Sequence, residues 1–360
     1  MSARPSTLYD VDRAALATLL DGEPRYRLDQ LWEGLYANAL DPADISNLPK
    51  ALRQRLAEEL PAALDPAAES VADGGETVKF LWELHDGATV ETVLMHYDRD
   101  DGSAERCTVC VSTQAGCAMA CSFCATGQAG FERHLTAGEI VEQLVRAQRR
   151  ANEHPGGPRR VSNVVFMGMG EPLANYDATW AALTRIHDDM GIGARRLTVS
   201  TVGLVPGIRR MASEDLPVNL AVSLHAADDE LRDQLVPINR RWPIRELITA
   251  CSDYLAVTSR RVSFEWALIS EVNDRYEDAD RLAALARPLG AHVNLIPLNP
   301  TPGYAVKGSS RNRVHRFRER LVDAGVNATI RDTRGSEIDA ACGQLRAGHE
   351  ATPIERPRRR

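Results

Sequence analysis

The sequence predicts an α/β protein whose core is a largely parallel sheet with crossover helices, either open or barrel-like, preceded by a small helical region. Strand-like apolar runs alternate with amphipathic segments along most of the chain, which is the pattern of βαβ units. The motifs with chemical content follow predicted strands, where α/β proteins gather their active sites. At 360 residues, the chain is long enough for one large α/β domain with an accessory domain attached.

Residues 8–64 are expected to form the helical region. Leu28, Leu31 and Trp32 recur at helical spacing, and Asp-Pro and Leu-Pro pairs interrupt the pattern. The stretch at residues 67–76 is rich in Ala, Glu and Gly and has the composition of a linker. We therefore expect a linker between the helical region and the main sheet.

Three strand-like runs follow at residues 78–84, 90–97 and 106–112. Asp-Gly pairs at residues 86–87 and 101–102 are turn signals between them. These features predict an antiparallel meander whose last strand leads into a cysteine-rich loop.

A helix is expected after that loop. Thr136 and Glu139 form a T-x-x-E capping box that predicts a helix to about residue 151. Beyond it, strands and helices alternate at the spacing of a parallel sheet with crossover helices. The expected strands are at residues 161–167, 196–201, 218–224, 262–268 and 292–296, and the expected helices are at residues 178–189, 245–257 and 280–287.

Charge and the N-terminal sequence limit the class of protein. The net charge of -7 argues against a protein that holds nucleic acid through its overall charge, although arginine-rich runs could form local positive patches. The N-terminus lacks an apolar signal segment, and no apolar stretch approaches the length needed to span a bilayer. We therefore expect a cytoplasmic protein that does not associate with membranes.

Cysteine usage indicates metal or redox chemistry. The chain has seven cysteines, and five of them fall within eighteen residues without any secretory signal. Cys117, Cys121 and Cys124 have the spacing C-x3-C-x2-C on a single loop. Three thiolates on such a loop can hold three irons of a cubane cluster and leave the fourth iron open, as a catalytic metal centre requires.

A structural zinc site is the alternative. Cys107-x-x-Cys110 followed by Cys121-x-x-Cys124 also resembles a site with four sulfur ligands. However, residues three apart in a strand point to opposite faces, and a zinc site would leave Cys117 unexplained. A non-catalytic zinc or iron–sulfur binding module is therefore the competing hypothesis from a different class.

The cysteine loop and three further segments resemble a known family. Phe123, before the last cysteine, completes the C-x3-C-x-aromatic-C hallmark of the radical S-adenosylmethionine (SAM) superfamily. Residues 110–117 (CVSTQAGC), 168–172 (GMGEP) and 341–345 (ACGQL) resemble the RNA adenine C2-methyltransferases. These bacterial enzymes methylate an adenine of 23S rRNA and, in many members, an adenine beside the tRNA anticodon. The resemblance covers nearly the whole chain from about residue 78.

The resemblance implies a radical SAM partial (β/α) barrel with a small N-terminal helical accessory domain. It divides the chain into a helical, RNA-binding-like domain at residues 1–70, a linker and β-hairpin extension at 71–105, a barrel core with a C-terminal catalytic-cysteine loop at 106–348, and a basic tail at 349–360. It also implies 23S rRNA and tRNA as substrates, a low-potential electron donor such as flavodoxin, and a monomer.

Two cofactors are implied in the same way, a 4Fe-4S cluster on the three loop cysteines and SAM on the open iron of that cluster. Small residues at 168–172 would let the backbone approach a ligand, and Glu171 would accept a hydrogen bond from the SAM ammonium group. Ser200 would contact the ribose, and His225 is assigned contact rather than catalysis. The SAM-binding residues that the resemblance implies are Gly170, Glu171, Ser200, Ser223, Leu224, His225 and Asn299.

The implied reaction uses two further cysteines. C2 of adenine lies between two ring nitrogens and is electron-poor, so a radical route that consumes two SAM molecules per turnover is implied. Cys342 is methylated by the first SAM, and a radical made from the second removes hydrogen from that S-methyl group before its carbon adds to C2. Cys110 then resolves the protein–RNA adduct by forming a disulfide with Cys342, and Glu91 accepts the C2 proton.

Some alternatives stay open from the sequence. Glu91 could equally be a solvated carboxylate on a strand, and Cys251, within a predicted helix, is expected to be a small buried apolar residue. A related enzyme of the antibiotic-resistance type methylates C8 of an rRNA adenine and shares the two-cysteine mechanism. The sequence does not separate C2 from C8 methylation.

Overall fold

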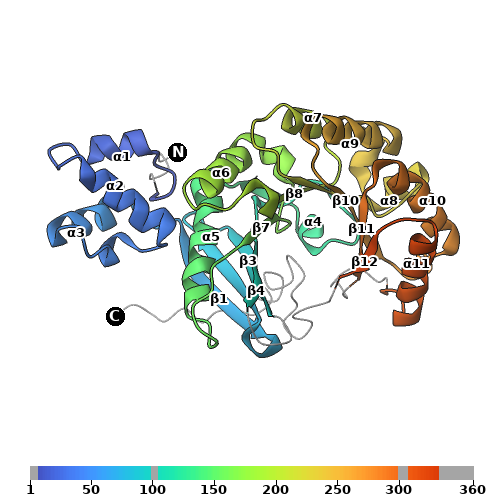
Figure 1. The fold of residues 1–360 in the computed structure, drawn as a ribbon, viewed down its shortest axis with the longest axis horizontal. Helices are drawn as coiled ribbons and strands as arrows, with labels where there is room; N and C mark the ends of the chain where they lie inside the picture. The colour runs from blue at the N-terminus through green and yellow to red at the C-terminus, as the bar shows by residue number, and fades with distance from the viewer. Residues whose placement is uncertain (1–6, 99–103, 299–306, 332–360) are drawn as a thin grey trace.

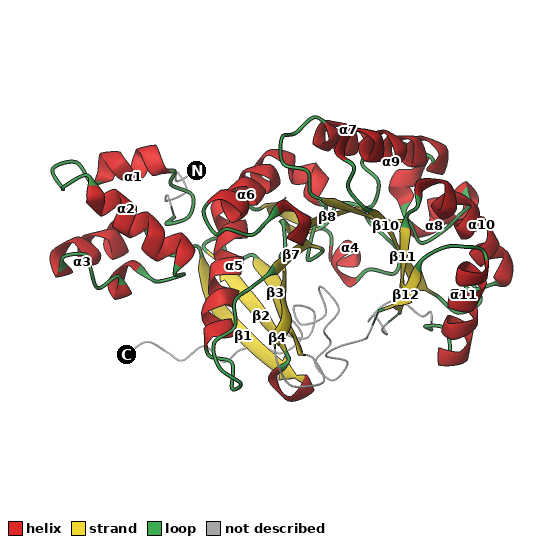
Figure 2. Ribbon diagram, viewed as in Figure 1, coloured by secondary structure: helices red, strands yellow, loops and turns green. Residues whose placement is uncertain are grey.

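The computed structural model describes residues 7–98, 104–298 and 307–331 of the 360-residue chain. Within this part, ten strands form one sheet in the order β1-β2-β3-β4-β7-β8-β9-β10-β11-β12. Figures 1 and 2 show this sheet curving as an open, partial barrel with the helices on its outer side. The expected α/β fold class is confirmed.

The parallel part of the sheet runs from β4 to β12, and crossover helices connect its strands. The apolar runs in the sequence predicted all of these strands except β12 to within a few residues, because strands covered on both faces are almost continuously apolar. The strands are β4 (Ala104–Cys110), β7 (Asn163–Phe166), β8 (Leu197–Thr201), β9 (Asn219–Ser223), β10 (Val262–Leu268), β11 (His292–Pro297) and β12 (Ala328–Ile330). The helices are α5 (Ala137–Asn152), α6 (Tyr176–Asp188), α7 (Val205–Ala212), α8 (Asp229–Leu235), α9 (Ile244–Thr258), α10 (Tyr276–Ala286) and α11 (Arg311–Asp323).

Three antiparallel strands extend the sheet beyond β4. The expected meander is present as β2 (Thr77–Leu84), β3 (Thr89–Asp98) and β4. The linker expected at residues 67–76 is wrong, since β1 (Leu64–Ala72) pairs along its length with β2. Strand formation here depends on pairing with a neighbour rather than on composition, which explains why the Ala- and Glu-rich sequence was misleading. The domain boundary expected at residue 70 therefore falls inside a strand.

A group of short helices precedes the sheet and packs on the outer side of α5 and α6 (Figure 1). Trp32 donates from its indole nitrogen to Asp189 at 2.9 Å, and Arg149 pairs with Asp41 at 2.6 Å. The apolar residues of these helices belong to the same buried cluster as the sheet and its helices. The elements are α1 (Arg13–Leu19), α2 (Tyr26–Trp32), a π-helical turn η1 (Glu33–Ala37), a 3-10 turn η2 (Pro42–Asp44) and α3 (Lys50–Glu59).

Helix α5 begins at the predicted capping box. The Glu139 N–H donates to Thr136 Oγ1 at 3.2 Å, and the Thr136 N–H donates to Glu139 Oε2 at 2.9 Å. One turn further, Gln143 accepts from the Ser112 N–H at 2.8 Å and donates to the Ser112 carbonyl at 2.9 Å. The helix thereby fixes the segment that leaves β4 and continues toward the cysteine loop.

That segment is joined to the loop that follows β7. The Thr113 N–H donates to the Met169 carbonyl at 2.8 Å, and the Glu171 N–H donates to Gln114 Oε1 at 2.8 Å. A Cβ atom on Gly170 would lie 2.6 Å from the Gln114 Cβ, and the φ of Gly170 is +100°. Position 170 therefore requires glycine because the chain passes close to Gln114 there, whether or not a ligand also approaches.

None of the helices in residues 7–98, 104–298 and 307–331 combines the length and the apolarity needed to cross a bilayer.

We expect Gly170→Ala to lower the free energy of unfolding by about 1–3 kcal/mol more than Gly157→Ala. Both glycines have nearly the same φ, +100° and +99°, so both variants carry the same backbone strain. Only Gly170 has a neighbour in the way, because no atom lies within 4 Å of the Cβ position at Gly157. Urea unfolding of the two variants measures the difference, and equal losses would contradict the close-approach argument.

Candidate active site

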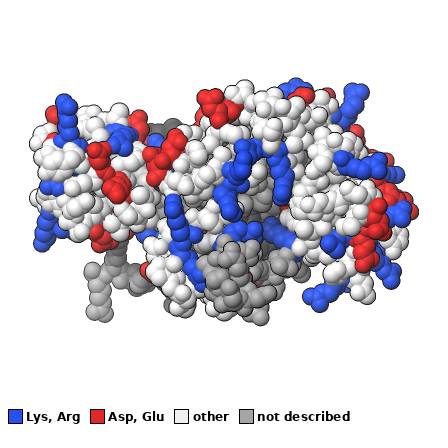
Figure 3. Space-filling model, in the orientation of Figure 1, with Lys and Arg blue, Asp and Glu red and all other residues white. Residues whose placement is uncertain are grey.

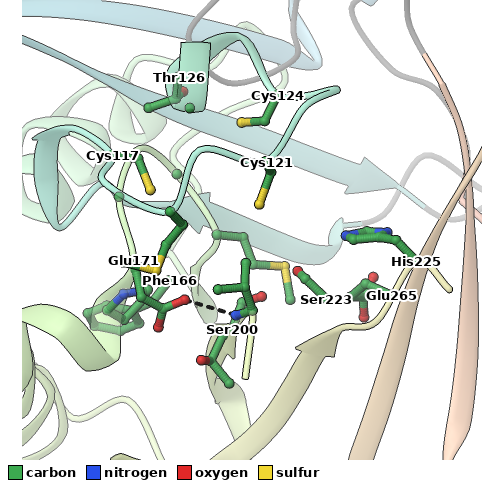
Figure 4. Close-up of a pocket in the computed structure, with 18 of the residues that line it drawn as sticks. Cys117, Cys121, Cys124, Thr126, Phe166, Glu171, Ser200, Ser223, His225 and Glu265 are labelled. Atoms are coloured by element: carbon green, nitrogen blue, oxygen red, sulfur yellow. Dashed lines mark hydrogen bonds between the residues drawn. The ribbon is translucent and has the colours of Figure 1, made fainter. Parts of the chain in front are cut away.

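A cavity lies at the carboxyl ends of the central parallel strands, next to the cysteine loop. Figure 4 shows the sulfur atoms of Cys117, Cys121 and Cys124 turned toward it, facing the side chains at the strand ends. Within the described residues, the motifs therefore lie together at this end of the sheet, as expected. The polar and small residues around the cavity include Gly168, Gly170, Glu171, Ser200, Thr201, Ser223, His225, Glu265 and Arg331.

The cysteine loop has its own support. It leaves β5 (Gln114–Gly116), passes through the short helix α4 (Ala125–Ala129) and returns through β6 (Phe131–His134). The Cys117 N–H donates to the Gly130 carbonyl at 2.8 Å, and the Ser122 N–H donates to the Leu235 carbonyl at 3.1 Å. Hydrogen bonds within the protein therefore hold the loop from both sides.

The three thiols fit an iron–sulfur cluster. Burial raises the pKa of Cys117 to about 12, and burial likewise raises the pKa of Cys121 above its usual value. Cysteine binds a metal as the thiolate, and burial disfavours the thiolate of a free cysteine. Positively charged iron would therefore be needed to stabilise the three thiolates here. Three soft sulfur donors on one loop, with open space in front of them, suit a 4Fe-4S cluster that keeps one iron for another ligand.

The four-sulfur arrangement of the zinc hypothesis is not formed. Cys107 is buried in the main core, whereas Cys110 lies on the opposite face of β4 beside Val93 and Met95. Cys121 packs in a third cluster with Leu235. The expectation that Cys107 and Cys110 point to opposite faces is confirmed, and the two cannot share one ion with the loop cysteines.

Glu171 is buried at the edge of the cavity, where both carboxylate oxygens accept backbone hydrogen bonds. The Leu173 N–H donates to Oε1 at 2.9 Å, and the Val202 N–H donates to Oε2 at 2.8 Å. Burial raises the pKa of Glu171 to about 7 despite these bonds. The carboxylate thereby ties the loop after β7 to the end of β8. The Thr201 side chain also hydrogen-bonds to it, so three of its four lone-pair positions are occupied and one remains for a ligand.

The serines expected in the SAM pocket line the cavity at the ends of β8 and β9. Ser200 and Ser223 both reach it, and His225 follows on the same side. Leu224, between them, is fully buried in the main core and is not among the cavity-lining residues. Ser223 and Leu224 point to opposite sides as in an extended strand. His225 has a φ of +59°, so a tight turn after β9 brings its side chain to the cavity.

His225 is held in one orientation. Its Nδ1 accepts from the Ala267 N–H at 3.0 Å, and its ring lies edge-on to Phe123 with centroids 4.7 Å apart. Burial, and then the positive charge of Arg232, lower the pKa of His225 to about 3, so the ring is neutral. Because Nδ1 is an acceptor, the single ring proton is assigned to Nε2, which is free to donate to a ligand in the cavity.

Glu91 and Cys110 lie on one face of the sheet, outside the cavity lining but on the side that Met167 connects to it. Glu91 and Val93 point to the same face of β3, and Val93 is the cross-strand partner of Cys110. Met167 packs on this cluster and also lines the cavity. Glu91 is not the solvated carboxylate considered above, because it forms a 3.0 Å ion pair with Lys79 in which the side chains are 1% and 0% exposed.

Asn299 and Cys342 lie outside the described residues. The contact of Asn299 with SAM and the disulfide between Cys342 and Cys110 stay predictions. Cys251 is fully buried in α9, as expected of a small apolar residue.

Sequence reasoning missed Glu265 and Arg331, which also line the cavity. Glu265 is buried in β10, where it accepts from the Ser263 hydroxyl at 3.0 Å and from the Asn294 amide at 2.7 Å. A single acidic residue within an otherwise largely apolar strand was the available signal. Arg331 follows directly after β12, a short strand that the sequence did not reveal.

Comparisons with known proteins agree with this geometry. The sequence model of the radical SAM superfamily matches residues 111–283. The chain is 55% identical over 351 residues to a probable dual-specificity RNA methyltransferase RlmN of Parafrankia sp. (strain EAN1pec), covering 93% of this chain and 89% of the relative. A protein of the same description from Salinispora tropica is 51% identical over 353 residues, covering 95% of this chain and 93% of the relative.

A solved structure is similar over nearly the whole length. It is the crystal structure of a radical SAM methyltransferase from Sphaerobacter thermophilus, with 52% sequence identity and a TM-score of 0.88. The alignment covers 95% of this chain and 100% of that one.

We expect Lys79→Met to lower the free energy of unfolding by about 3 kcal/mol or more, because it removes the ammonium group beside the buried Glu91 carboxylate. The double variant Lys79→Met, Glu91→Leu is expected to regain much of this loss, since it removes both charges. Urea unfolding measures the three free energies.

The matched control for this pair is Arg320→Met. Arg320 pairs with Asp280 at 2.7 Å, but the two side chains are 52% and 47% exposed, so solvent screens the pair and its loss is expected to change stability far less than Lys79→Met does. A Lys79→Met variant no less stable than Arg320→Met would refute the role of burial.

Proposed function

Because the chain belongs to the radical SAM superfamily and, within it, to the dual-specificity RNA methyltransferases, we propose that it methylates C2 of an adenine in 23S rRNA and in tRNA. The observation that carries this proposal is the convergence at one cavity of three cysteine thiols with the polar ends of neighbouring parallel strands. Such a cavity can hold a cluster and a cosubstrate side by side.

Each cofactor has a proposed set of residues. Cys117, Cys121 and Cys124 hold the 4Fe-4S cluster, which when reduced supplies the electron that cleaves SAM. Glu171 accepts from the SAM ammonium group, and Ser200 bonds the ribose. His225 donates from Nε2, an assignment supported by the acceptor role of its Nδ1. Ser223 and Asn299 complete the proposed pocket. Leu224 has its side chain in the core and its backbone bonded to Glu265 and Arg232, so its proposed part is to position Ser223 and His225 on either side of it.

The proposed chemistry of the chain uses two thiols and one carboxylate. The Cys342 thiolate accepts a methyl group from one SAM molecule, and the S-methyl group then loses a hydrogen atom to a radical derived from a second. Its carbon forms the bond to adenine C2. The Cys110 thiolate attacks the Cys342 sulfur, and the new disulfide replaces the bond between sulfur and the transferred carbon. That carbon takes up a proton to become the methyl group, and the one electron left over from the radical addition would return to the 4Fe-4S cluster that supplied it. Glu91 accepts the C2 proton.

The position of Cys110 and Glu91 supports this scheme. Both lie on the sheet face that Met167 connects to the cavity. The Lys79 ammonium group holds the Glu91 side chain in place, 3.0 Å away and out of water. A resolving thiol and a base beside the same cavity are what an adduct formed there requires.

RNA binding is proposed to be local rather than global. Figure 3 shows lysine and arginine side chains gathered around the hollowed middle of one face, while acidic side chains lie mostly toward its outer edges. A positive surface around an active site attracts phosphates even when the net charge is -7. The N-terminal helices are proposed as an RNA-binding accessory domain. A low-potential donor such as flavodoxin, a monomeric state and a cytoplasmic location stay predictions.

The direct test begins with oxygen-free reconstitution of the chain. We expect about four irons per chain, reductive cleavage of SAM, and 2-methyladenosine in digests of treated 23S rRNA and tRNA, identified by mass spectrometry. Cys121→Ala is expected to lose cluster and activity, whereas Cys251→Ala, in α9 and not part of the cavity lining, keeps both. Recovery of 8-methyladenosine would replace the proposed regiochemistry, and a zinc-loaded chain without iron would overturn the proposal.

The two-thiol scheme makes a separate prediction. Cys110→Ala is expected to accumulate a covalent enzyme–RNA adduct, and Cys342→Ala is expected to abolish methyl transfer without forming one. Cys107→Ala is the matched control, because Cys107 lies on the opposite face of the same strand. Denaturing gels with labelled RNA detect the adduct. Full activity of Cys342→Ala would show that the scheme is wrong.

A further inference from the structure

Arg232 in α8 is a fully buried cation next to the candidate site. Its Nε donates to the Leu224 carbonyl at 3.0 Å. Its Nη2 donates to the Val202 carbonyl at 2.6 Å and to the Ser223 carbonyl at 3.3 Å. One guanidinium group therefore connects the ends of β8 and β9, the two strands that carry the serines of the cavity.

No carboxylate contacts this guanidinium directly among the described residues. Its remaining hydrogen bond is to Asn239 Oδ1 at 2.8 Å, and the Asn239 amide in turn donates to Asp229 at 3.0 Å and to Asp233 at 2.7 Å. Burial lowers the pKa of Arg232 to about 10, which leaves it positively charged at neutral pH. A buried charge that is balanced only through an intervening amide is costly and exerts a long-range field.

The field of Arg232 reaches the cysteine loop. One turn after Arg232, the Leu235 carbonyl accepts from the Ser122 N–H, and Leu235 packs against Cys121. Arg232 is thus one helical turn from a residue that both bonds and packs against the cysteine loop.

We propose that Arg232 raises the reduction potential of the cluster held by Cys117, Cys121 and Cys124. Reduction adds one negative charge to the cluster, and a fixed positive charge in a low-dielectric surrounding stabilises that added charge. Arg232 acts through the cluster and touches no reacting atom, so it is a positioning residue rather than a catalytic one. This inference rests on the cluster assigned under the proposed function.

The test separates the effect of the Arg232 charge on the reduction potential from the effect of its hydrogen bonds. Arg232→Lys keeps the positive charge, and Arg232→Gln removes it while keeping a donor. Midpoint potentials are measured by redox titration followed by electron paramagnetic resonance, on preparations with the full iron content. We expect Arg232→Gln to make reduction about tenfold less favourable, a shift of about 59 mV to more negative potential for one electron, and Arg232→Lys to remain near the wild type.

Arg281→Gln is the matched control. Arg281 pairs with Asp228 at the start of the same helix, but it is 56% exposed, so solvent screens its charge and no shift is expected. Equal shifts in Arg232→Lys and Arg232→Gln would overturn the proposal in favour of a structural role. Unchanged potentials in both variants would also overturn it.

A further variant, for which the opposite shift in reduction potential is expected, tests the proposal even if Arg232→Gln fails to bind the cluster. Asp233→Asn removes an anion that partly balances Arg232 through Asn239, so it is expected to shift the potential to more positive values. If the arginine variants bind too little iron, the absence of a positive shift in Asp233→Asn overturns the inference. A wild-type chain without a cluster or SAM cleavage would refute the proposed function instead, which keeps the two failures distinct.

Discussion

The hydrogen-bonded contact between the segment after β4 and the loop after β7 is the interaction on which the site depends. Thr113 and Gln114 bind Met169 and Glu171 across it, and Gln143 of α5 fixes Ser112 from the other side. The first segment continues into the cysteine loop, and the second carries the glycines and the carboxylate at the cavity edge. A single contact therefore sets the position of the cysteine loop relative to the loop that carries Glu171, and only glycine at position 170 permits it.

Buried ionisable groups lie in and near the candidate site, and they are stabilised in three ways. Glu171 and Glu265 accept hydrogen bonds from backbone or side-chain donors, Glu91 pairs with Lys79, and Arg232 donates to carbonyl oxygens. Burial of charge is expensive, and perturbed groups gather where chemistry needs them. Loss of hydration on burial thus disfavours the charged form of each group, and hydrogen bonds or an ion pair compensate for that loss.

Periodicity and short motifs predicted the fold where local sequence and tertiary context agree. The capping box at Thr136, the apolar runs of the parallel strands and the three-cysteine loop are features of this kind. The sequence misjudged β1, because an Ala- and Glu-rich edge strand is stabilised by its neighbour rather than by its own propensity. It also missed Glu265 and Arg232, because neither belongs to a motif and their importance comes from burial, which only the folded chain reveals.

The support of the cysteine loop bears on how such an enzyme withstands exposure to air. Its shape is held by bonds from Cys117 to Gly130 and from Ser122 to Leu235, all within the polypeptide. The surrounding strands and helices are stabilised by a large apolar core that contains none of the three sulfur ligands. These contacts do not involve a metal, so loss of the proposed cluster to oxygen is expected to leave the scaffold folded and to allow iron and sulfide to be restored to the same polypeptide.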